Sequence, residues 1–167
     1  MITVAISVAT SVDGYLATLD GDSDWVLDDD LFDKTAQEYG CIVVGGATFR
    51  QYEGDLYPIT GLTNLVLTHE TSRQDTKDTF FISSVDEAIQ KATELGHDKL
   101  LVVGGAKTNE SFMRSGKVDS LFVDVHPLAL GEGKRLLGDF TEPLQLKLTA
   151  SKEYSEGFVH LEYSLKS

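Results

Sequence analysis

Two stretches of this chain are nearly the same, Val43-Val44-Gly45-Gly46-Ala47-Thr48 and Val102-Val103-Gly104-Gly105-Ala106-Lys107-Thr108. Each begins in an apolar run typical of a strand buried on both faces, and each opens a segment that is predicted to be helical. Glycine lets a ligand approach the backbone, and the first N–H groups of a helix are unpaired donors with a positive dipole. The pair favours a phosphate-bearing ligand at the carboxyl edge of a parallel sheet, while each glycine pair taken alone also fits a simple tight turn.

Neither stretch is one of the common nucleotide-binding motifs. The pattern G-x-G-x-x-G marks the usual dinucleotide-binding fold, and G-x-x-x-x-G-K-[ST] marks the P-loop NTPases. Both patterns are absent at these two turns. The sequence therefore argues against those two protein classes.

Strand-like and helix-like segments alternate along the chain. Runs rich in Val, Ile, Leu, Phe and Thr predict eight strands, at 2–8, 41–45, 64–68, 79–82, 99–103, 119–126, 144–152 and 157–165. Apolar stripes at helical spacing predict four helices, at 28–39, 47–53, 84–95 and 106–115. This order predicts an α/β fold in one domain over residues 1–167, with a three-layer α/β/α arrangement, a mixed eight-stranded sheet and a C-terminal antiparallel hairpin.

The helix predicted at 84–95 has the clearest boundary signals. Ser84 and Glu87 have the spacing of a capping box, in which each side chain accepts from a backbone N–H at the start of the helix. Gly96 can end the helix in the left-handed conformation.

The charge of the chain restricts its partners. Asp and Glu number 27 against 14 Lys and Arg, a net charge of −13 over 167 residues, which argues against binding of nucleic acid or of a membrane surface. The single cysteine, Cys41, rules out a disulfide framework and a cysteine-based metal cluster. No apolar stretch approaches the ~18 residues that span a bilayer, and the first residues lack the basic region of a signal peptide. We therefore expect a cytoplasmic protein.

Aspartates gather near the start of the chain, with eight of them and no Lys or Arg between residues 13 and 33. Asp13 belongs to an Asp-Gly pair, which is typical of a turn, but it also follows the first strand and could face a cleft there. Asp28 and Asp29 suit the start of a helix, because carboxylates stabilise that end of the dipole. Asp30 is near Trp25 and is predicted to project into a cleft as a proton donor.

A calcium loop is an alternative interpretation of this acidic segment. Asp20, Asp22 and Asp24 have the alternate spacing that such a loop uses. Trp25 stands where the loop needs glycine, and Leu31 stands where it needs a bidentate glutamate. The sequence therefore argues against calcium, and no metal site is predicted.

A glycine-rich loop follows the strand predicted at 119–126. It begins at His126-Pro127 and carries Lys134 and Arg135 beside Gly133. Adjacent cations next to glycine can receive an anion. An ordinary solvated loop fits the same residues equally well.

With these motifs in place, the chain resembles the dihydrofolate reductase superfamily. Within it, the chain is similar to the reductase domain of riboflavin biosynthesis, the C-terminal half of a bifunctional deaminase–reductase, and to bacterial relatives of that domain. The resemblance covers nearly the whole chain. It rests on an S-x-D-G at 11–14, the loop Ser23-Asp24-Trp25 and the two glycine turns. It also rests on Gly116-Lys117-Val118-Asp119-Ser120-Leu121 and the residues up to Gly133, which resemble the family's G-L-V-D-E-L…P…L-G-x-G signature.

The resemblance implies a dihydrofolate-reductase-like fold and a reductase that transfers hydride from NADPH to a C=N or C=O bond of a pterin-like or aminopyrimidine substrate. It implies a homodimer that pairs through the C-terminal part of the sheet. Asp13 would lie near the nicotinamide and, with Trp25 and Asp30, would bind the substrate, with Asp13 and Asp30 as the catalytic candidates. The residues that would hold the cofactor are Gly45, Gly46, Ala47, Thr48, Thr68, Val103, Gly104, Gly105, Ala106, Lys107 and Thr108.

Two positions depart from the family pattern. Many relatives have arginine where Gly46 stands, and that arginine pairs with the 2′-phosphate of NADPH, so NADH remains an alternative cofactor. Arg50 or Arg73 could substitute for it. The riboflavin reductases have glutamate where Val103 stands, which argues against their substrate. The two losses also leave open a non-catalytic, nucleotide-binding or sensor relative of the same fold.

Overall fold

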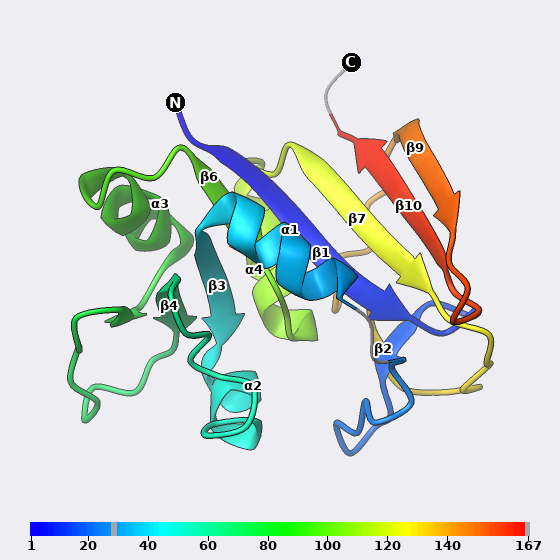
Figure 1. Cartoon of the computed structure of the whole chain (residues 1–167), viewed down its shortest axis with the longest axis horizontal. Coiled ribbons are helices and arrows are strands. Elements are labelled where there is room, and N and C mark those ends of the chain that lie inside the picture. The colour runs from blue at the N-terminus through cyan, green and yellow to red at the C-terminus, as the bar shows by residue number, and fades with distance from the viewer. Residues whose placement is uncertain (28–29, 166–167) are drawn as a thin grey trace.

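The core of the molecule is an eight-stranded sheet with the strand order β5-β4-β3-β6-β1-β7-β10-β9 (Figure 1). The computed structural model describes residues 1–27 and 30–165. The strands of this sheet are β1 (Thr3–Thr10), β3 (Cys41–Gly45), β4 (Thr63–Leu67), β5 (Thr79–Ile82), β6 (Lys99–Val102), β7 (Ser120–Val125), β9 (Lys147–Glu153) and β10 (Val159–Ser164). The strands from β5 to β7 are parallel, whereas β10 runs antiparallel to β7 and β9 antiparallel to β10. The predicted mixed sheet and terminal hairpin are confirmed.

A second, two-stranded sheet was not predicted. It pairs β2 (Tyr15–Ala17) with β8 (Lys134–Arg135). Both strands are too short to give a recognisable alternation of apolar and polar residues. The pairing joins the turn after β1 to the glycine-rich loop after β7.

Helices cover both faces of the sheet. They are α1 (Leu31–Tyr39), α2 (Gly46–Gln51), α3 (Val85–Glu94) and α4 (Ala106–Ser115). Ala36 of α1 and Phe49 of α2 belong to one core cluster, while Ala88 of α3 and Phe112 of α4 belong to the other. Figure 1 shows α1 in front of the sheet and α4 behind it. The predicted four-helix, three-layer arrangement is confirmed.

The two apolar runs that precede the glycine turns supply the centre of the sheet. All five residues of β3 are buried, and Leu100, Leu101 and Val102 of β6 are fully buried. Side chains alternate along a strand, so Leu100 and Val102 enter one core cluster and Leu101 enters the other. A continuous apolar run is thus what a strand between two helical layers requires.

The helix ends largely follow the predicted signals. The Ser84 hydroxyl accepts from the Glu87 N–H at 3.1 Å, as a capping box requires, but the Glu87 carboxylate accepts from the N–H of Ser83 at 2.7 Å. Gly96, just past α3, has the left-handed φ of +85°. The helix expected from residue 28 begins at Leu31, and Asp28 and Asp29 lie outside the described residues.

The parallel strands all end at the same edge of the sheet, the lower edge in Figure 1. At this edge α2 begins directly after β3, and α4 begins shortly after β6. None of the helices in the described ranges is long and apolar enough to cross a membrane.

Candidate functional site

A cleft of about 1570 Å³ opens at the carboxyl edge of the sheet. It is lined by residues at the ends of β1, β3, β4, β6 and β7 and by the loops that follow them. Pockets for drug-sized ligands are typically about 300–1,000 Å³, so this cleft has room for a larger ligand or for two ligands together.

The residues predicted to hold a cofactor all line this cleft. They come from both glycine turns and from the residue after β4, and they are Gly45, Gly46, Ala47, Thr48, Thr68, Val103, Gly104, Gly105, Ala106, Lys107 and Thr108. The turns lie next to each other because β3 and β6 are neighbours in the sheet. The Gly45 N–H donates to the Gly104 carbonyl at 2.8 Å, which joins the two turns directly.

The two turns also pack into each other through missing side chains. A Cβ added to Gly45 would stand 2.3 Å from the Thr108 hydroxyl oxygen, and a Cβ added to Gly105 would stand 2.9 Å from that of Thr48. Each turn therefore uses a glycine to admit the threonine of the other. These two glycines have a packing role beyond any contact with a ligand.

Gly104 differs from them because its missing side chain faces open space. It lines the cleft and has a φ of +101°, and among the described residues no neighbouring heavy atom lies within 4 Å of an added Cβ. This is the geometry at which a flat ligand could lie against backbone. The peptide bond between Gly104 and Gly105 is cis.

Asp13 has a structural position outside the lining of the cleft. Its carboxylate accepts from the Ser11 hydroxyl at 2.6 Å and from the N–H groups of Leu130 and Gly131 at 3.1 and 2.7 Å. These hydrogen bonds, that of Ser11 first, lower the pKa of Asp13 to about 2. A carboxylate held ionised in this way is a poor proton donor, so the structure argues against the catalytic role expected of Asp13. It connects the turn after β1 to the loop after β7 instead.

Asp30 does not project into the cleft, so that prediction is wrong. It precedes α1, is exposed, and forms an ion pair with Lys34 at 2.8 Å. The hydrogen bond from Lys34 lowers the pKa of Asp30. Trp25 is half-buried and lies outside the cleft lining, although its neighbours Asp24 and Val26 are part of it.

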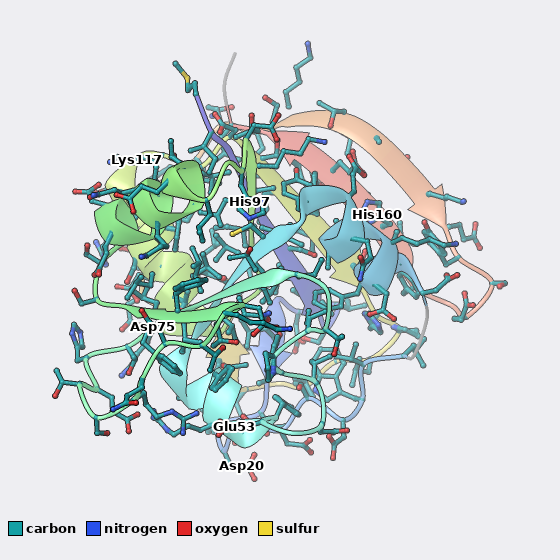
Figure 2. All side chains as sticks on the ribbon, turned by 60° about the vertical axis from the view of Figure 1, so that its left-hand side comes forward. Asp20, Glu53, Asp75, His97, Lys117 and His160 are labelled. Carbon is teal, nitrogen blue, oxygen red and sulfur yellow. The ribbon has the colours of Figure 1, made fainter. Side chains whose placement is uncertain are left out.

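The cleft continues beyond β6 to an end that is rich in acceptor groups. Asp24, Asp33 and Asp124 line it together with His126. Asp124, near the end of β7, accepts a hydrogen bond from Nδ1 of His160 at 2.6 Å. Figure 2 shows His160 on β10, on the side of the sheet that α1 covers.

Two buried ring nitrogens in this region have no hydrogen-bond partner within residues 1–27 and 30–165. They are Nε1 of Trp25 and Nε2 of His126, whose rings meet edge to face at 5.7 Å. Nδ1 of His126 lies 2.9 Å from the carbonyl oxygen of Asp124, which can only accept, so Nδ1 carries the proton and Nε2 is an acceptor. Phe158 stacks on the ring of His126, with the ring centres 5.1 Å apart. An unused donor and an unused acceptor thus lie behind the cleft at its β7 end.

Comparison with known proteins identifies the family. Residues 59–160 match the model of the RibD C-terminal domain. The chain belongs to the RibD C-terminal domain family. The match includes the second glycine turn and the signature over 116–133, and it confirms the resemblance to the riboflavin-biosynthesis reductase domain.

Individual relatives extend the likeness to nearly the whole chain. The protein YyaP of Bacillus subtilis (strain 168) is 25% identical over 175 residues, which cover 96% of this chain and 93% of YyaP. A protein from Shewanella sp. PV-4, assigned to riboflavin biosynthesis, has a similar structure, with a TM-score of 0.81, 20% identity and coverage of 99% and 100% of the two chains.

A third relative is larger. It is a diaminohydroxyphosphoribosylaminopyrimidine deaminase/5-amino-6-(5-phosphoribosylamino)uracil reductase from Thermotoga maritima, with a TM-score of 0.73 and 20% identity. The match covers 98% of this chain and 56% of that one. Together with the element order, these likenesses confirm the dihydrofolate-reductase-like fold.

In this RibD C-terminal domain, the cleft contains further residues that the motifs did not reveal. Leu67 and His69 flank Thr68, and Ser83 follows β5. Leu67, His69 and Ser83 could have been predicted from topology alone, because the residues at the ends of parallel strands lie at the same edge of the sheet. Arg50 of α2, named from the sequence as a substitute for the missing arginine, also lines the cleft. Lys134 and Arg135, singled out for anion binding, line the cleft as well.

The buried histidine of the RibD C-terminal domain predicts a pH-dependent stability. The carboxylate of Asp124 first, then that of Glu162, raises the pKa of His160 above its ordinary value near 6.5. The contacts of protonated His160 with these carboxylates therefore stabilise the folded state fully below about pH 6.5. This stabilisation is lost as pH rises through the higher folded-state pKa of His160. We expect His160→Gln to destabilise the protein more at pH 6 than at pH 9, as measured by denaturant unfolding. A penalty that is equal at both pH values would contradict this.

Proposed function

We propose that the protein is an oxidoreductase that binds NADPH or NADH along the β4–β3–β6 part of the cleft and reduces a small heterocycle at the β1–β7 end. The observation that carries this proposal is the pairing of the two glycine turns along one wall of a single large cleft. Seven of the residues involved belong to β3 or to the helices α2 and α4, so the wall is built into the sheet and the helices that follow its strands.

The residues of the cleft fit a dinucleotide. Gly104 leaves open space against backbone, α4 begins at the same place with its unpaired N–H groups, and Lys107 adds a cation in its first turn. Helix N-termini and cations favour phosphate even in a protein of net negative charge. The cofactor would supply the hydride, while the chain would align the reacting atoms and exclude water.

The substrate end favours a ring that carries hydrogen-bond donors. Within the described ranges, the carboxyl groups of Asp24, Asp33 and Asp124 line it. Ionised carboxylates only accept hydrogen bonds, so they suit the amino and ring N–H groups of a pterin-like or aminopyrimidine substrate. They also disfavour a strongly anionic substrate at this end. The C=N or C=O group to be reduced would take its proton from a water that these carboxylates hold.

The experiment has a binding arm and a turnover arm. NADPH and NADH are titrated against the protein by fluorescence, and the loss of reduced-nicotinamide absorbance is then followed over a panel of pterins, aminopyrimidines and small carbonyl compounds. We expect binding of at least one cofactor and oxidation with one or more members of the panel. Binding without oxidation would favour the non-catalytic nucleotide-binding alternative, and absence of binding would refute both.

Further expectations concern assembly and location. We propose a homodimer formed through the C-terminal part of the sheet. Support comes from β9, whose residues are all exposed, and from the exposed Leu144, Leu146 and Leu148 in and before it. Sedimentation measures the mass directly. We also place the protein in the cytoplasm.

A further inference from the structure

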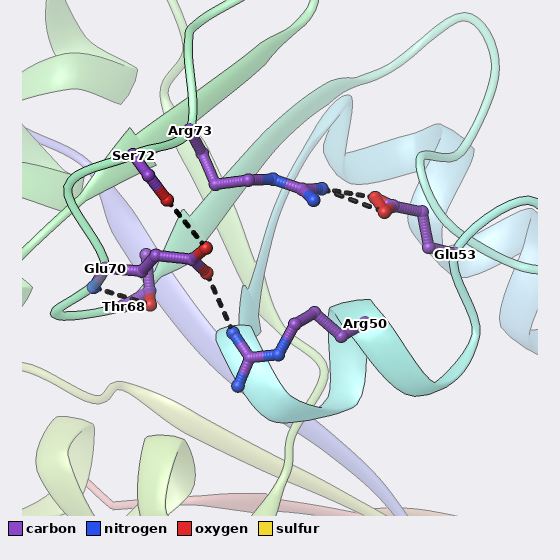
Figure 3. Close-up of polar contacts among 6 residues, drawn as sticks. All are labelled: Arg50, Glu53, Thr68, Glu70, Ser72 and Arg73. Atoms are coloured by element: carbon purple, nitrogen blue, oxygen red, sulfur yellow. Dashed lines mark hydrogen bonds and ion pairs between the residues drawn. The ribbon is translucent and has the colours of Figure 1, made fainter.

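Arg50 of α2 and Arg73, which follows β4, make different contacts and therefore have different roles (Figure 3). The Arg73 guanidinium forms an ion pair with Glu53 and lies 5.5 and 5.3 Å from the ring centres of Phe49 and Phe81. It is held between a carboxylate and two aromatic rings, and it does not line the cleft. Arg73 is therefore committed to the structure.

Arg50 is more accessible and lines the cleft. Its side chain is 53% exposed, and its Nη1 donates to Oε2 of Glu70 at 3.1 Å. The side chain reaches back over the start of α2, because a Cβ added to Gly46 would lie 3.4 Å from the same Nη1. That added Cβ would also lie 2.8 and 2.9 Å from Oγ1 and Cβ of Thr68. Position 46 has no room for a side chain, and the guanidinium beside it comes from Arg50.

Glu70 is held in place by the turn that follows β4. Its Oε1 accepts from the Ser72 hydroxyl at 2.9 Å, and its own N–H donates to the Thr68 hydroxyl at 3.1 Å. Figure 3 shows the carboxylate between Ser72 and Arg50. The Arg50 guanidinium, which lines the cleft, thus has the carboxylate of Glu70 as its partner, and that carboxylate is held in place by the turn.

We propose that the Arg50–Glu70 pair determines the choice between NADPH and NADH, which rests on the proposed function above. The two cofactors differ only in the 2′ substituent of the adenosine ribose. Arginine suits a phosphate there, whereas a carboxylate suits a hydroxyl, to which it can act as acceptor. A 2′-phosphate would compete with Glu70 for the Arg50 guanidinium and would be repelled by the carboxylate. A 2′-hydroxyl would leave the ion pair intact. The wild-type protein should therefore bind the two cofactors with affinities within about tenfold of each other.

The test is the ratio of NADPH to NADH affinity, measured by titration of the full-length protein. Glu70→Gln removes the competing charge and should raise the ratio at least about tenfold in favour of NADPH. Arg50→Gln removes the phosphate partner and should lower the ratio at least about tenfold relative to Glu70→Gln. Neither side chain is buried, since Arg50 is 53% and Glu70 36% exposed, and thermal unfolding checks that each variant is folded.

Glu53→Gln is the matched control. It makes the same change in net charge at the neighbouring Arg73 pair, outside the cleft, so it should alter the ratio by less than about twofold. An equal shift in this control would mean that net charge alone acts, and it would overturn the inference. If the ratio of NADPH to NADH affinity is unchanged in both test variants while NADPH still binds, the inference is also overturned. The proposed function would then be left intact. Failure of the wild-type protein to bind either cofactor would overturn the proposed function and this inference with it.

Discussion

Replacing Ala47 with aspartate should weaken the binding of NADPH and NADH by about 10- to 100-fold without destabilising the protein. Ala47 is exposed, lines the cleft and lies in the first turn of α2. A carboxylate there would face the cofactor phosphates, and like charges in close contact are strongly unfavourable. In the free protein, the same carboxylate is favourable at the start of a helix. The variant should therefore lose cofactor affinity without losing stability. Titration measures the affinity, and thermal unfolding measures the stability.

The control for this prediction is Ala129→Asp. Ala129 is also exposed, lies outside the lining of the cleft, and gives the same change in net charge. Its cofactor affinity should stay within about twofold of the wild type. If Ala47→Asp and Ala129→Asp bind equally well, the cofactor phosphates do not lie at this turn.

Gly45→Ala should lower the free energy of unfolding by about 2 kcal/mol, because the added methyl group would overlap the Thr108 hydroxyl at 2.3 Å. Both residues are buried where the two turns meet, so relieving the overlap requires one of the packed turns to shift. Denaturant unfolding of the single variants and of Gly45→Ala with Thr108→Ala measures the effect as a double-mutant cycle. Removal of the hydroxyl should recover most of the loss. A cycle in which the two changes are simply additive would show that the turns do not pack in this way.

The parts of the fold that could be predicted from the sequence are those set by local pattern. The strand β3 and the helix α3 can be recognised from the spacing of their apolar residues. A strand buried on both faces is apolar throughout, whereas a helix buried on one face is apolar every three or four residues. The strands β2 and β8 could not be found this way. They have three and two residues, and their pairing depends on a contact between segments more than a hundred residues apart.

The same distinction between local pattern and long-range contact applies to the candidate site. The glycine turns were found because strand, turn and helix start are consecutive in the chain. The environments of Asp13 and Asp30 could not be predicted, because their partners are not part of the motifs that contain them. Leu130 and Gly131, which donate to Asp13, are 117 and 118 residues away in the sequence. Lys34, which forms the ion pair with Asp30, lies in the first turn of α1. The pairing of Arg50 with Glu70 depends in the same way on how α2 packs beside β4.

The reciprocal packing of the two glycine turns has a consequence for how this repeated sequence can change over time. Gly45 admits Thr108, and Gly105 admits Thr48, so each copy of the repeat is the mould for the other. A larger residue at position 45 is compatible only with a smaller one at position 108, and positions 105 and 48 are linked in the same way. A change at either glycine therefore requires a compensating change in the other turn, so the two turns are constrained to vary together.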